Sequence, residues 1–295
     1  MPHLHEDKIK FLEEMANTIR QDIIQMVVKA ESGHVGGPMG MADIFTALYF
    51  HILKHDPKKP DWADRDRVVL SNGHICPVLY AAMARAGYFP VEELQTLRQF
   101  GSRLQGHPHR TALPGLETTS GPLGSGLSQA VGMAIGARMD GSTLLTTSAK
   151  KNINVYGFMS DGEQDCGQIW EAAMLAGKLK LDNLTCLIDR NNIQIDGLTE
   201  NIMPLEPLRE KYEAFNWHVL EINGHNFVEI VNAYEEAQAI FEKPVLIIAH
   251  TIPGKGVDFM EFQYQWHSKT FKPEEVTDAL NQLRTLGGKI ASEHQ

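Results

Sequence analysis

Several features that would place the chain in a special class are scarce or missing. It contains only three cysteines, Cys76, Cys166 and Cys186, and no CxxC pair. This excludes a disulfide scaffold and fits a reducing, cytoplasmic setting. No apolar run approaches the length of a membrane span, and the chain begins with the charged stretch MPHLHEDKIK. We therefore expect no membrane insertion and no secretory signal.

Positive charge is also in short supply. The chain carries 27 Lys and Arg against 37 Asp and Glu, a formal net charge of −10. A surface of that sign repels nucleic-acid phosphates and anionic lipids, so we expect neither nucleic acid nor a membrane as a partner. There is no low-complexity segment and no internal repeat. A length of 295 residues allows one large core or two modest ones.

Apolar runs of strand length alternate with amphipathic segments of helix length, which is typical of a doubly wound α/β sheet with helices on both faces. No linker divides the pattern, so we expect a single domain over 1–295, with a last helix and a polar tail at about 273–295. The expected strands are 67–70, 153–159, 184–188, 218–222 and 245–249. The expected helices are 6–30, 41–53, 75–86, 127–139, a segment after 162, 205–215, 226–241 and 273–286.

The stretch from Ile153 to Gly197 is the most informative part of the chain. An apolar run ends at Ser160-Asp161-Gly162, a helical segment follows, and a second apolar run leads into Asp189-Arg190-Asn191-Asn192. Strand, helix and strand in this order predict a parallel crossover unit, whose two strands end at the same edge of the sheet. Asp161 and Asn191 should therefore lie side by side where such sheets bind ligands.

A carboxylate, an amide oxygen and a nearby main-chain carbonyl form half a shell of hard oxygens. Such a shell suits Mg²⁺ or Ca²⁺ completed by ligand phosphates and water. Gly162 would start the helix and let backbone N–H groups approach an anion. The alternative is that Asp161 only caps the helix and Asn191 lies in a turn. The spacing alone does not choose between the two.

Two further features suggest a polar ligand. Residues 98–126 are rich in glycine and proline and predict a long loop, which is uncommon in a compact domain unless it is functional. Four of the thirteen histidines directly follow a glycine: His34, His74, His107 and His225. Any one of them alone would more often be structural. Gly124-x-Gly126 does not indicate a dinucleotide site, because Gln129 occupies the third glycine position and no strand precedes it.

Taken together, these motifs resemble the transketolase family. Asp161-Gly162 followed by Asp189-x-Asn191-x-Ile193-x-Ile195-Asp196-Gly197 is similar to the family's thiamine-diphosphate fingerprint. Segments 32–34, 71–74, 106–108 and 114–124 resemble further family segments in the same order. The resemblance covers about residues 10–270.

The resemblance implies a role for each matching residue. Asp161, the Asn191 side chain and the Ile193 carbonyl would bind Mg²⁺ (or Ca²⁺), Gly162 would approach the diphosphate of thiamine diphosphate, and Ile195 would pack against the thiazolium. His74 and His267 would contact the diphosphate, and Gly121 and Leu123 the aminopyrimidine. His34, His107 and His267 would act on the substrate, where an imidazole can both donate and accept protons. His225 falls outside this set, and we assign it a structural role.

The chain departs from the family pattern at several positions. Ser160 and Ser268 stand where glycine is usual, and Cys166 replaces a glutamate of a carboxylate network near the subunit contact. The exit loop 252–256 also differs from the commonest form. The Ser160 side chain should be tolerated if the backbone φ is negative. The thiol of Cys166 cannot relay hydrogen bonds as a carboxylate does, which affects any coupling between two active sites.

Only the first domain of a full transketolase resembles this chain. We therefore expect the amino-terminal subunit of a split enzyme, active with a partner chain that carries the pyrimidine-binding domain, assembled as a heterotetramer of two copies of each chain. The expected reaction is transfer of a two-carbon ketol unit from a ketose to an aldose, both as sugar phosphates, as in the pentose phosphate pathway. The alternatives are half of a deoxyxylulose-phosphate synthase, a 2-oxo acid dehydrogenase component, or a non-catalytic cofactor-binding subunit.

Overall fold

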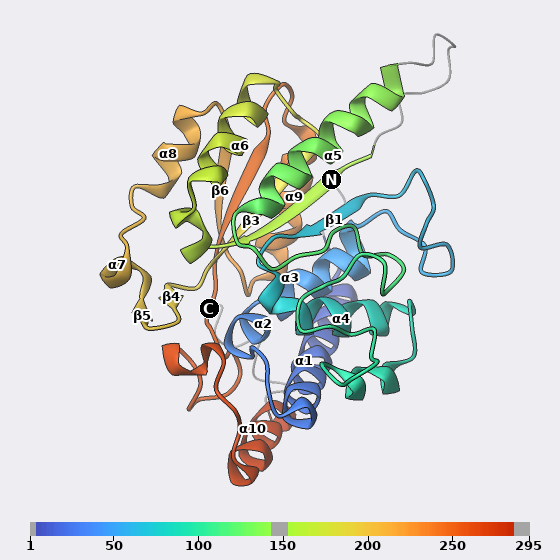
Figure 1. The fold of residues 1–295 in the computed structure, drawn as a ribbon, viewed down its shortest axis with the longest axis vertical. Helices are drawn as coiled ribbons and strands as arrows, with labels where there is room; N and C mark the ends of the chain where they lie inside the picture. The colour runs from blue at the N-terminus through green and yellow to red at the C-terminus, as the bar shows by residue number, and fades with distance from the viewer. Residues whose placement is uncertain (1–3, 143–152, 286–295) are drawn as a thin grey trace.

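The computed structural model describes residues 4–142 and 153–285. Its centre is a five-stranded sheet in the order β1-β2-β3-β7-β6, in which every neighbouring pair is parallel (Figure 1). The strands are β1 (Arg67–Leu70), β2 (Val155–Ser160), β3 (Leu184–Arg190), β6 (His218–Asn223) and β7 (Val245–His250). The five strands predicted from apolar runs are thus all present, and the predicted α/β class is confirmed.

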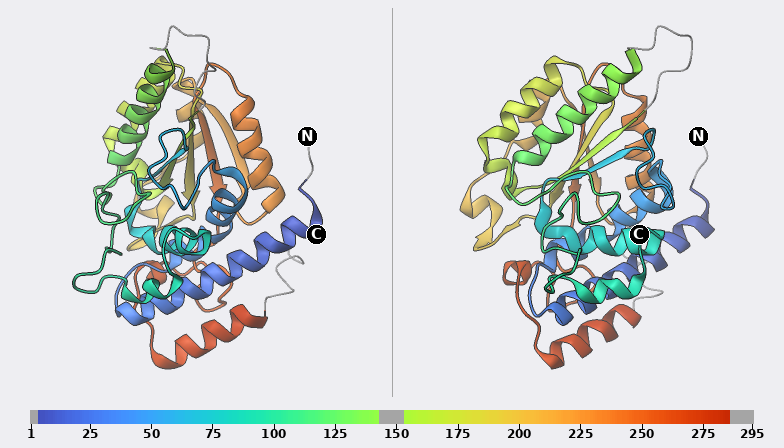
Figure 2. Two further views of the ribbon diagram at one scale, coloured as in Figure 1. Left: turned by 90° about the vertical axis from the view of Figure 1, so that its right-hand side faces the viewer. Right: turned by 45° about the vertical axis from the view of Figure 1, so that its right-hand side comes forward.

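Helices cover both faces of the sheet, because successive strand side chains point to opposite sides. Along β7, Val245 and Ile247 pack into one core and Leu246 and Ile248 into the other. Figure 2 shows α5 (Ser125–Ser142) and α9 (Phe227–Ala239) on opposite sides of the strands. The face with α5 also holds α6 (Gly167–Lys178) and α8 (Leu208–Ala214), and the face with α9 holds α1 (Glu6–Ala30), α3 (Ala42–Ala47) and α4 (Cys76–Ala86).

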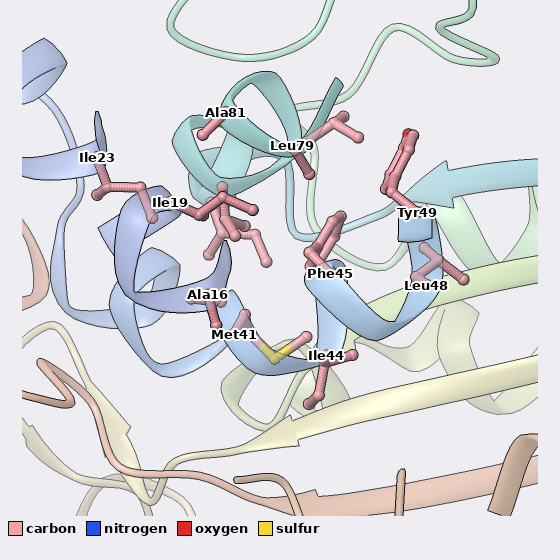
Figure 3. Close-up of a cluster of buried hydrophobic side chains, with 14 of the residues drawn as sticks. Ala16, Ile19, Ile23, Met41, Ile44, Phe45, Leu48, Tyr49, Leu79 and Ala81 are labelled. Carbon is pink, nitrogen blue, oxygen red and sulfur yellow. The ribbon is translucent and has the colours of Figure 1, made fainter. Parts of the chain in front are cut away.

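The larger core lies between α1, α3 and α4. Figure 3 shows Ile19 of α1 pointing toward Phe45 of α3 and Leu79 of α4, with Ile23 one turn further along α1, and all four are buried. Helix α10 (Pro273–Thr285) packs on the outer side of α1, which Figure 2 shows. This arrangement follows from the apolar stripe of α1 and holds the start of the chain against its last described helix.

The helical region around residue 41 differs from the prediction. It begins earlier and consists of α2 (Gly36–Gly40), α3 and the π-helical turn η1 (Leu48–Ile52). The first and last residues of α2 are glycines in close contact with the backbone of other segments. Gly36 and Gly40 lie against main-chain carbonyls, since a Cβ added there would be 3.0 Å from the Trp266 oxygen and 2.9 Å from the Ile252 oxygen. They permit close packing rather than ending a helix.

The region after β2 also requires correction. Gly162 does not start the predicted α-helix but a 3₁₀ turn, η4 (Gly162–Asp165), and α6 begins only at Gly167. The N–H of Gly162 donates to the Asp161 carboxylate, with 2.7 Å between N and Oδ1. The expectation that Gly162 starts the helix is therefore wrong, because α6 begins five residues later.

Several short elements were not predicted from the sequence. They are the hairpin of β4 (Ile193–Gln194) and β5 (Gly197–Leu198), the helix α7 (Thr199–Ile202), and the 3₁₀ turns η2 (Gly73–Ile75), η3 (Val91–Thr96) and η5 (Tyr264–His267). The predicted helix 205–215 is the shorter α8. The loop prediction is confirmed between η3 and α5. The predicted helix 127–139 is longer than expected, because α5 continues to Ser142, and the polar tail lies outside the described residues.

Candidate functional site: a cavity at the carboxyl edge of the sheet

A cavity of about 420 Å³ lies at the carboxyl edge of the sheet, within the size range of small-molecule sites. All eleven residues singled out from the sequence line it: His34, His74, His107, Gly121, Leu123, Asp161, Gly162, Asn191, Ile193, Ile195 and His267. The structure therefore brings together residues that are up to 233 positions apart. Their roles stay predictions.

The sheet register explains why Asp161 and Asn191 meet. β2 and β3 are adjacent and parallel, and Ser160 of β2 pairs with Asp189 of β3. The polar residues that follow each strand therefore lie at the same edge of the sheet. The N–H of Asn192 donates to Asp161 Oδ2 over 2.9 Å, so the two strand ends are joined directly. The sequence-based expectation that the pair would be adjacent is confirmed.

Asn191 is held in one orientation by its neighbours. Its Nδ2 donates to Asp189 Oδ2 at 2.8 Å, and its Oδ1 accepts from the N–H of Ile193 at 3.0 Å. Asp189 in turn accepts a hydrogen bond from the Thr251 hydroxyl at the end of β7. The amide oxygen therefore has one lone pair left for an ion or a ligand, since a carbonyl oxygen can accept two hydrogen bonds.

No group of three or more His, Cys, Asp or Glu side chains in the described part of the chain has the geometry of a metal site. An ion next to Asp161 would therefore need the Asn191 amide, main-chain carbonyls and ligand oxygens to complete its shell. That donor set suits Mg²⁺ or Ca²⁺, which bind oxygen and accept ligand phosphates and water, better than Zn²⁺. The residues present thus fit a hard cation held together with a phosphate-bearing ligand.

Four imidazoles also line the cavity. The ring centre of His34 lies 5.0 Å from those of His74 and His267 and 6.3 Å from that of His107. The Nδ1 atom of His34 is buried and has no hydrogen-bond partner among the described residues. A buried polar atom without a partner is rare in proteins, so this nitrogen is available to a bound ligand.

The surroundings keep these imidazoles neutral. Burial and, in smaller measure, the neighbouring His267, His107 and Arg98 lower the pKa of His34 to about 4. Burial also lowers the pKa of His74, His107 and His267 below the ordinary value. At neutral pH each ring therefore carries one N–H donor and one acceptor nitrogen. Neutral rings of this kind can both donate hydrogen bonds to and accept them from the hydroxyl groups of a ligand.

His225 lies elsewhere, in keeping with the structural role assigned to it. Its Nδ1 is 2.7 Å from Asp43 Oδ2, and its Nε2 accepts the N–H of Ile252 at 2.8 Å. Arg20 donates to the same Asp43 oxygen. This buried cluster ties α1 and α3 to the loop after β7. That loop ends in η5, which carries His267 to the cavity.

The residues at which the chain departs from the family pattern can also be located. Ser160 ends β2 and is not among the residues with positive φ, so its side chain is accommodated as expected. Cys166 is partly exposed at the N-cap of α6. A Cβ added to Gly124 would lie 2.7 Å from the Cβ of Cys166, so this thiol borders the segment that ends at Gly124.

Sequence reasoning missed two charged residues beside the cavity. Glu163 is fully buried and fixes the segment that ends at Gly124, and Arg190 is buried against Asp161. The only signal was their place within the motifs, directly after Asp161-Gly162 and inside the stretch after β3. Ile202 of α7 and Gln194 of β4 also line the cavity, and neither had a recognisable pattern.

Comparison with known proteins agrees with this geometry. Residues 12–287 match the family model described as "Transketolase, thiamine diphosphate binding domain". The chain is 45% identical over 276 residues to a 6-deoxy-6-sulfo-D-fructose transketolase subunit of Clostridium sp. (strain MSTE9), covering 94% of this chain and 97% of that relative. It is 39% identical over 287 residues to an apulose-4-phosphate transketolase subunit of Phocaeicola vulgatus, covering 97% of this chain and 99% of that relative.

Longer transketolases match over part of their length. Transketolase 1 of Escherichia coli (strain K12) is 44% identical over 250 residues, which cover 82% of this chain but 37% of that protein. The transketolase structure from Leishmania mexicana has a TM-score of 0.86 at 34% identity and covers 96% of this chain and 45% of its own. The chain thus spans the length of the two subunits and less than half of the longer enzymes. On this evidence the chain belongs to the transketolase family, as a thiamine-diphosphate-binding domain.

Proposed function

We propose that the chain, together with a partner chain, transfers a two-carbon ketol unit from a ketose to an aldose. The observation that carries this proposal is one cavity that is lined both by a hard-oxygen site and by four neutral imidazoles. An ion-binding side suits a diphosphate, and a row of donor–acceptor rings suits a polyhydroxylated substrate. Family membership supports the same reaction.

Thiamine diphosphate, when bound, supplies the carbanion chemistry that breaks a carbon–carbon bond next to a ketone. Asp161, the Asn191 amide and the Ile193 carbonyl would hold Mg²⁺ or Ca²⁺, and His74 and His267 would donate to the diphosphate. Gly162 would approach the diphosphate, and a larger residue is disfavoured at this position because a Cβ there would be 3.0 Å from the Gln194 side chain. Gly121 and Leu123 would meet the aminopyrimidine, and Ile195 the thiazolium.

His34 and His107 would bind the sugar substrate. The ring centres of His34 and His107 lie 6.3 Å apart, and burial lowers the pKa of both rings. As neutral rings they would orient the ketose hydroxyls and take up or return protons there, and His267 would assist from the η5 turn. The two relatives of subunit length are named for a sulfonated ketose and for a sugar phosphate. We accordingly propose an anionic sugar, most simply a sugar phosphate, as the substrate class.

A partner chain is supported by the surface around the cavity. Large apolar side chains are exposed there: Leu123 (38%), Ile195 (66%), Leu198 (49%), Ile202 (46%) and Met203 (54%). Such a patch beside a ligand site marks an interaction surface. The relatives that match over nearly their whole length are named as subunits. The partner that we propose is a carboxy-terminal transketolase subunit, in a symmetric assembly of two copies of each chain.

Within the described residues, the carboxylates near the cavity are already engaged or lie at the diphosphate end of the expected cofactor. Asp161 is hydrogen-bonded on both oxygens, and Glu163 is buried with three donors. Asp165 is exposed and bonded to Gln194. Asp196 lines the cavity from the β4–β5 hairpin, next to the proposed metal ligands. The activating acid would therefore come from the partner.

None of the helices in the described ranges is long and apolar enough to cross a membrane. The three cysteines are free, which supports a reducing setting, and we propose the cytoplasm on that ground.

The deciding experiment reconstitutes the chain with the product of an adjacent reading frame that carries the pyrimidine-domain pattern. We expect ketol transfer from xylulose 5-phosphate to an aldose phosphate by the pair and none by either chain alone, with co-elution of the two chains on size exclusion. Turnover of pyruvate by the pair would favour a deoxyxylulose-phosphate synthase or a 2-oxo acid dehydrogenase component. Ketol transfer by this chain alone would refute the split-enzyme proposal, and a pair that binds cofactor without turnover would indicate a non-catalytic subunit.

A further inference from the structure

Arg190, the last residue of β3, connects the floor of the cavity to the protein surface. Its side chain is 4% exposed. Nη1 donates to Asp161 Oδ2 at 3.1 Å, and Nη2 donates to Glu200 Oε1 at 2.6 Å and to Glu206 Oε1 at 3.0 Å. The side chains of the two glutamates are 41% and 57% exposed. One buried cation therefore joins a buried carboxylate to two surface carboxylates.

The two oxygens of Asp161 are not equivalent. Oδ2 accepts from Arg190, from the Asn192 N–H at 2.9 Å and from the Thr199 hydroxyl at 3.1 Å. Oδ1 accepts one hydrogen bond in the described structure, from the Gly162 N–H at 2.7 Å. A carboxylate oxygen offers about two lone-pair sites. Oδ2 is therefore saturated by protein donors, and Oδ1 is the oxygen that retains capacity for a cation.

We propose that Arg190 is a positioning residue that fixes Asp161 so that Oδ1 is presented to the metal ion, and that it links this ion to the segment 199–206. The inference rests on the proposed function, since it takes Asp161 as a metal ligand. A planar guanidinium suits the task because it can bond several carboxylates at once in fixed directions, which the ammonium of lysine cannot do.

The segment 199–206 is built around the same cation. Glu200 accepts from Arg190 and from the Leu205 N–H at 3.2 Å, and Glu206 accepts from Arg190 and from the Leu208 N–H at 2.8 Å. Between the glutamates, Ile202 reaches the cavity wall. Loss of the guanidinium would therefore free both the metal ligand and one wall of the cavity. Binding of Mg²⁺ with the cofactor should in turn order this segment.

The test separates position from charge. If Arg190 acted only through its positive charge, it would repel Mg²⁺. The Arg190→Met variant would then bind Mg²⁺ more tightly than the wild type. Positioning predicts the reverse. Both Arg190→Met and Arg190→Lys should raise the dissociation constant of Mg²⁺, titrated at saturating thiamine diphosphate and followed by tryptophan fluorescence, by about 10- to 100-fold, as is usual for residues that orient metal ligands. Tighter or unchanged binding in Arg190→Met would overturn the proposal.

Arg209→Gln is the matched control. Arg209 also bridges two glutamates, Glu213 and Glu221, but does not contact Asp161, and the Mg²⁺ affinity of this variant should equal that of the wild type. Should both Arg190 variants fail to fold, the surface variant Glu200→Gln/Glu206→Gln decides. It should weaken Mg²⁺ binding and abolish the protection from hydrogen exchange that Mg²⁺ and thiamine diphosphate confer on amides 199–206. Wild-type affinity and protection in this variant would overturn the proposal.

These measurements use the full chain, alone and with its co-purified partner. A wild-type chain that takes up no thiamine diphosphate with Mg²⁺ in either form would contradict the proposed function itself. A wild type that binds both, with Arg190 variants that bind equally well, would contradict only the role of Arg190.

Discussion

Glu163 Oε1 accepts a hydrogen bond from the N–H of Gly124, with 2.5 Å between the two atoms. The same carboxylate accepts from the Ser71 hydroxyl and from the Ser160 N–H. One buried side chain therefore joins the ends of β1 and β2 to the segment 121–124, which is expected to meet the aminopyrimidine. Burial raises the pKa of Glu163, while these three donors favour its charged form.

We expect Glu163→Ala to lower both stability and cofactor affinity. It leaves three donors without a partner, and each such buried group costs about 1–3 kcal/mol. Urea unfolding and thiamine-diphosphate titration would measure the two effects. Asp165→Ala, which removes an exposed carboxylate two residues further on, should change the unfolding free energy by less than about 0.5 kcal/mol. Equal effects of the two variants would show that Glu163 does not fix the segment 121–124.

Asp161→Ala should abolish Mg²⁺-dependent binding of thiamine diphosphate. The amide of Asn191 and the carbonyl of Ile193 are neutral and cannot offset the loss of the only carboxylate in the proposed ligand set. Asn191→Ala should weaken binding less, because it removes a neutral ligand. Calorimetry with Mg²⁺ present and absent measures both, with Asp258→Ala, a change to an exposed loop carboxylate, as the control. Unchanged affinity in Asp161→Ala would place the site elsewhere.

The four imidazoles predict a loss of stability in mild acid. In the unfolded chain His34 binds a proton near its ordinary pKa of about 6.5, whereas in the folded protein its pKa is lowered to about 4. Between these values the unfolded state binds more protons, so the unfolding free energy falls as the pH falls from about 6.5 to 4.

His34→Asn should flatten this dependence, because it removes one of the groups that titrate differently in the two states. Urea unfolding of both proteins at several pH values in that window gives the two slopes. The two proteins have all other titrating groups in common. The difference between their slopes therefore measures the contribution of His34 and its effect on neighbouring groups. Parallel slopes would mean that His34 is protonated in the folded protein as readily as in the unfolded chain.

Gly177→Ala should destabilise the fold, because α6 and the end of α8 are in backbone contact there. A Cβ on Gly177 would lie 1.8 Å from the carbonyl oxygen of Phe215, so one of the two helices must move. Overpacking of this kind costs about 1–3 kcal/mol or more. Gly132→Ala in α5 is the matched change, with no atom within 4 Å of the added Cβ, and should stabilise by about 0.5–1 kcal/mol. Thermal unfolding compares them, and similar melting temperatures would contradict the predicted contact.

Met203→Lys should weaken association with the partner chain. Met203 is 54% exposed beside the cavity, so the change should leave the isolated chain as stable as before. A lysine charge buried at the interface without a partner costs more than about 1 kcal/mol, which is about fivefold or more in the dissociation constant. Phe241→Lys, a change to a 76% exposed side chain after α9, is the control. Equal affinities of both variants for the partner would place the interface elsewhere.

The sequence alone determined the sheet and the edge at which the site lies. Runs such as Leu184–Ile188 are apolar at nearly every position because both faces of a parallel strand are buried. The crossover between 159 and 184 then requires Asp161 and Asn191 to leave the sheet at the same edge. The resemblance to the family predicted that His34, His74, His107 and His267 share one site. Nothing else in the sequence indicated this, because the four residues are far apart in the chain.

Only the tertiary structure decided how these groups are held. Glu163 meets Ser71 across 92 residues and Gly124 across 39, and Arg190 reaches Glu206 in a segment with no periodic pattern. The helix of the crossover was predicted to start at Gly162 but starts at Gly167, and the reason is related. The buried hydrogen bonds of Asp161 and Glu163 stabilise a 3₁₀ turn there, and no local preference of residues 162–166 signals those bonds. A hydrophobic pattern reports which side of an element is buried, but the partner of a buried polar atom is chosen only when distant segments come together.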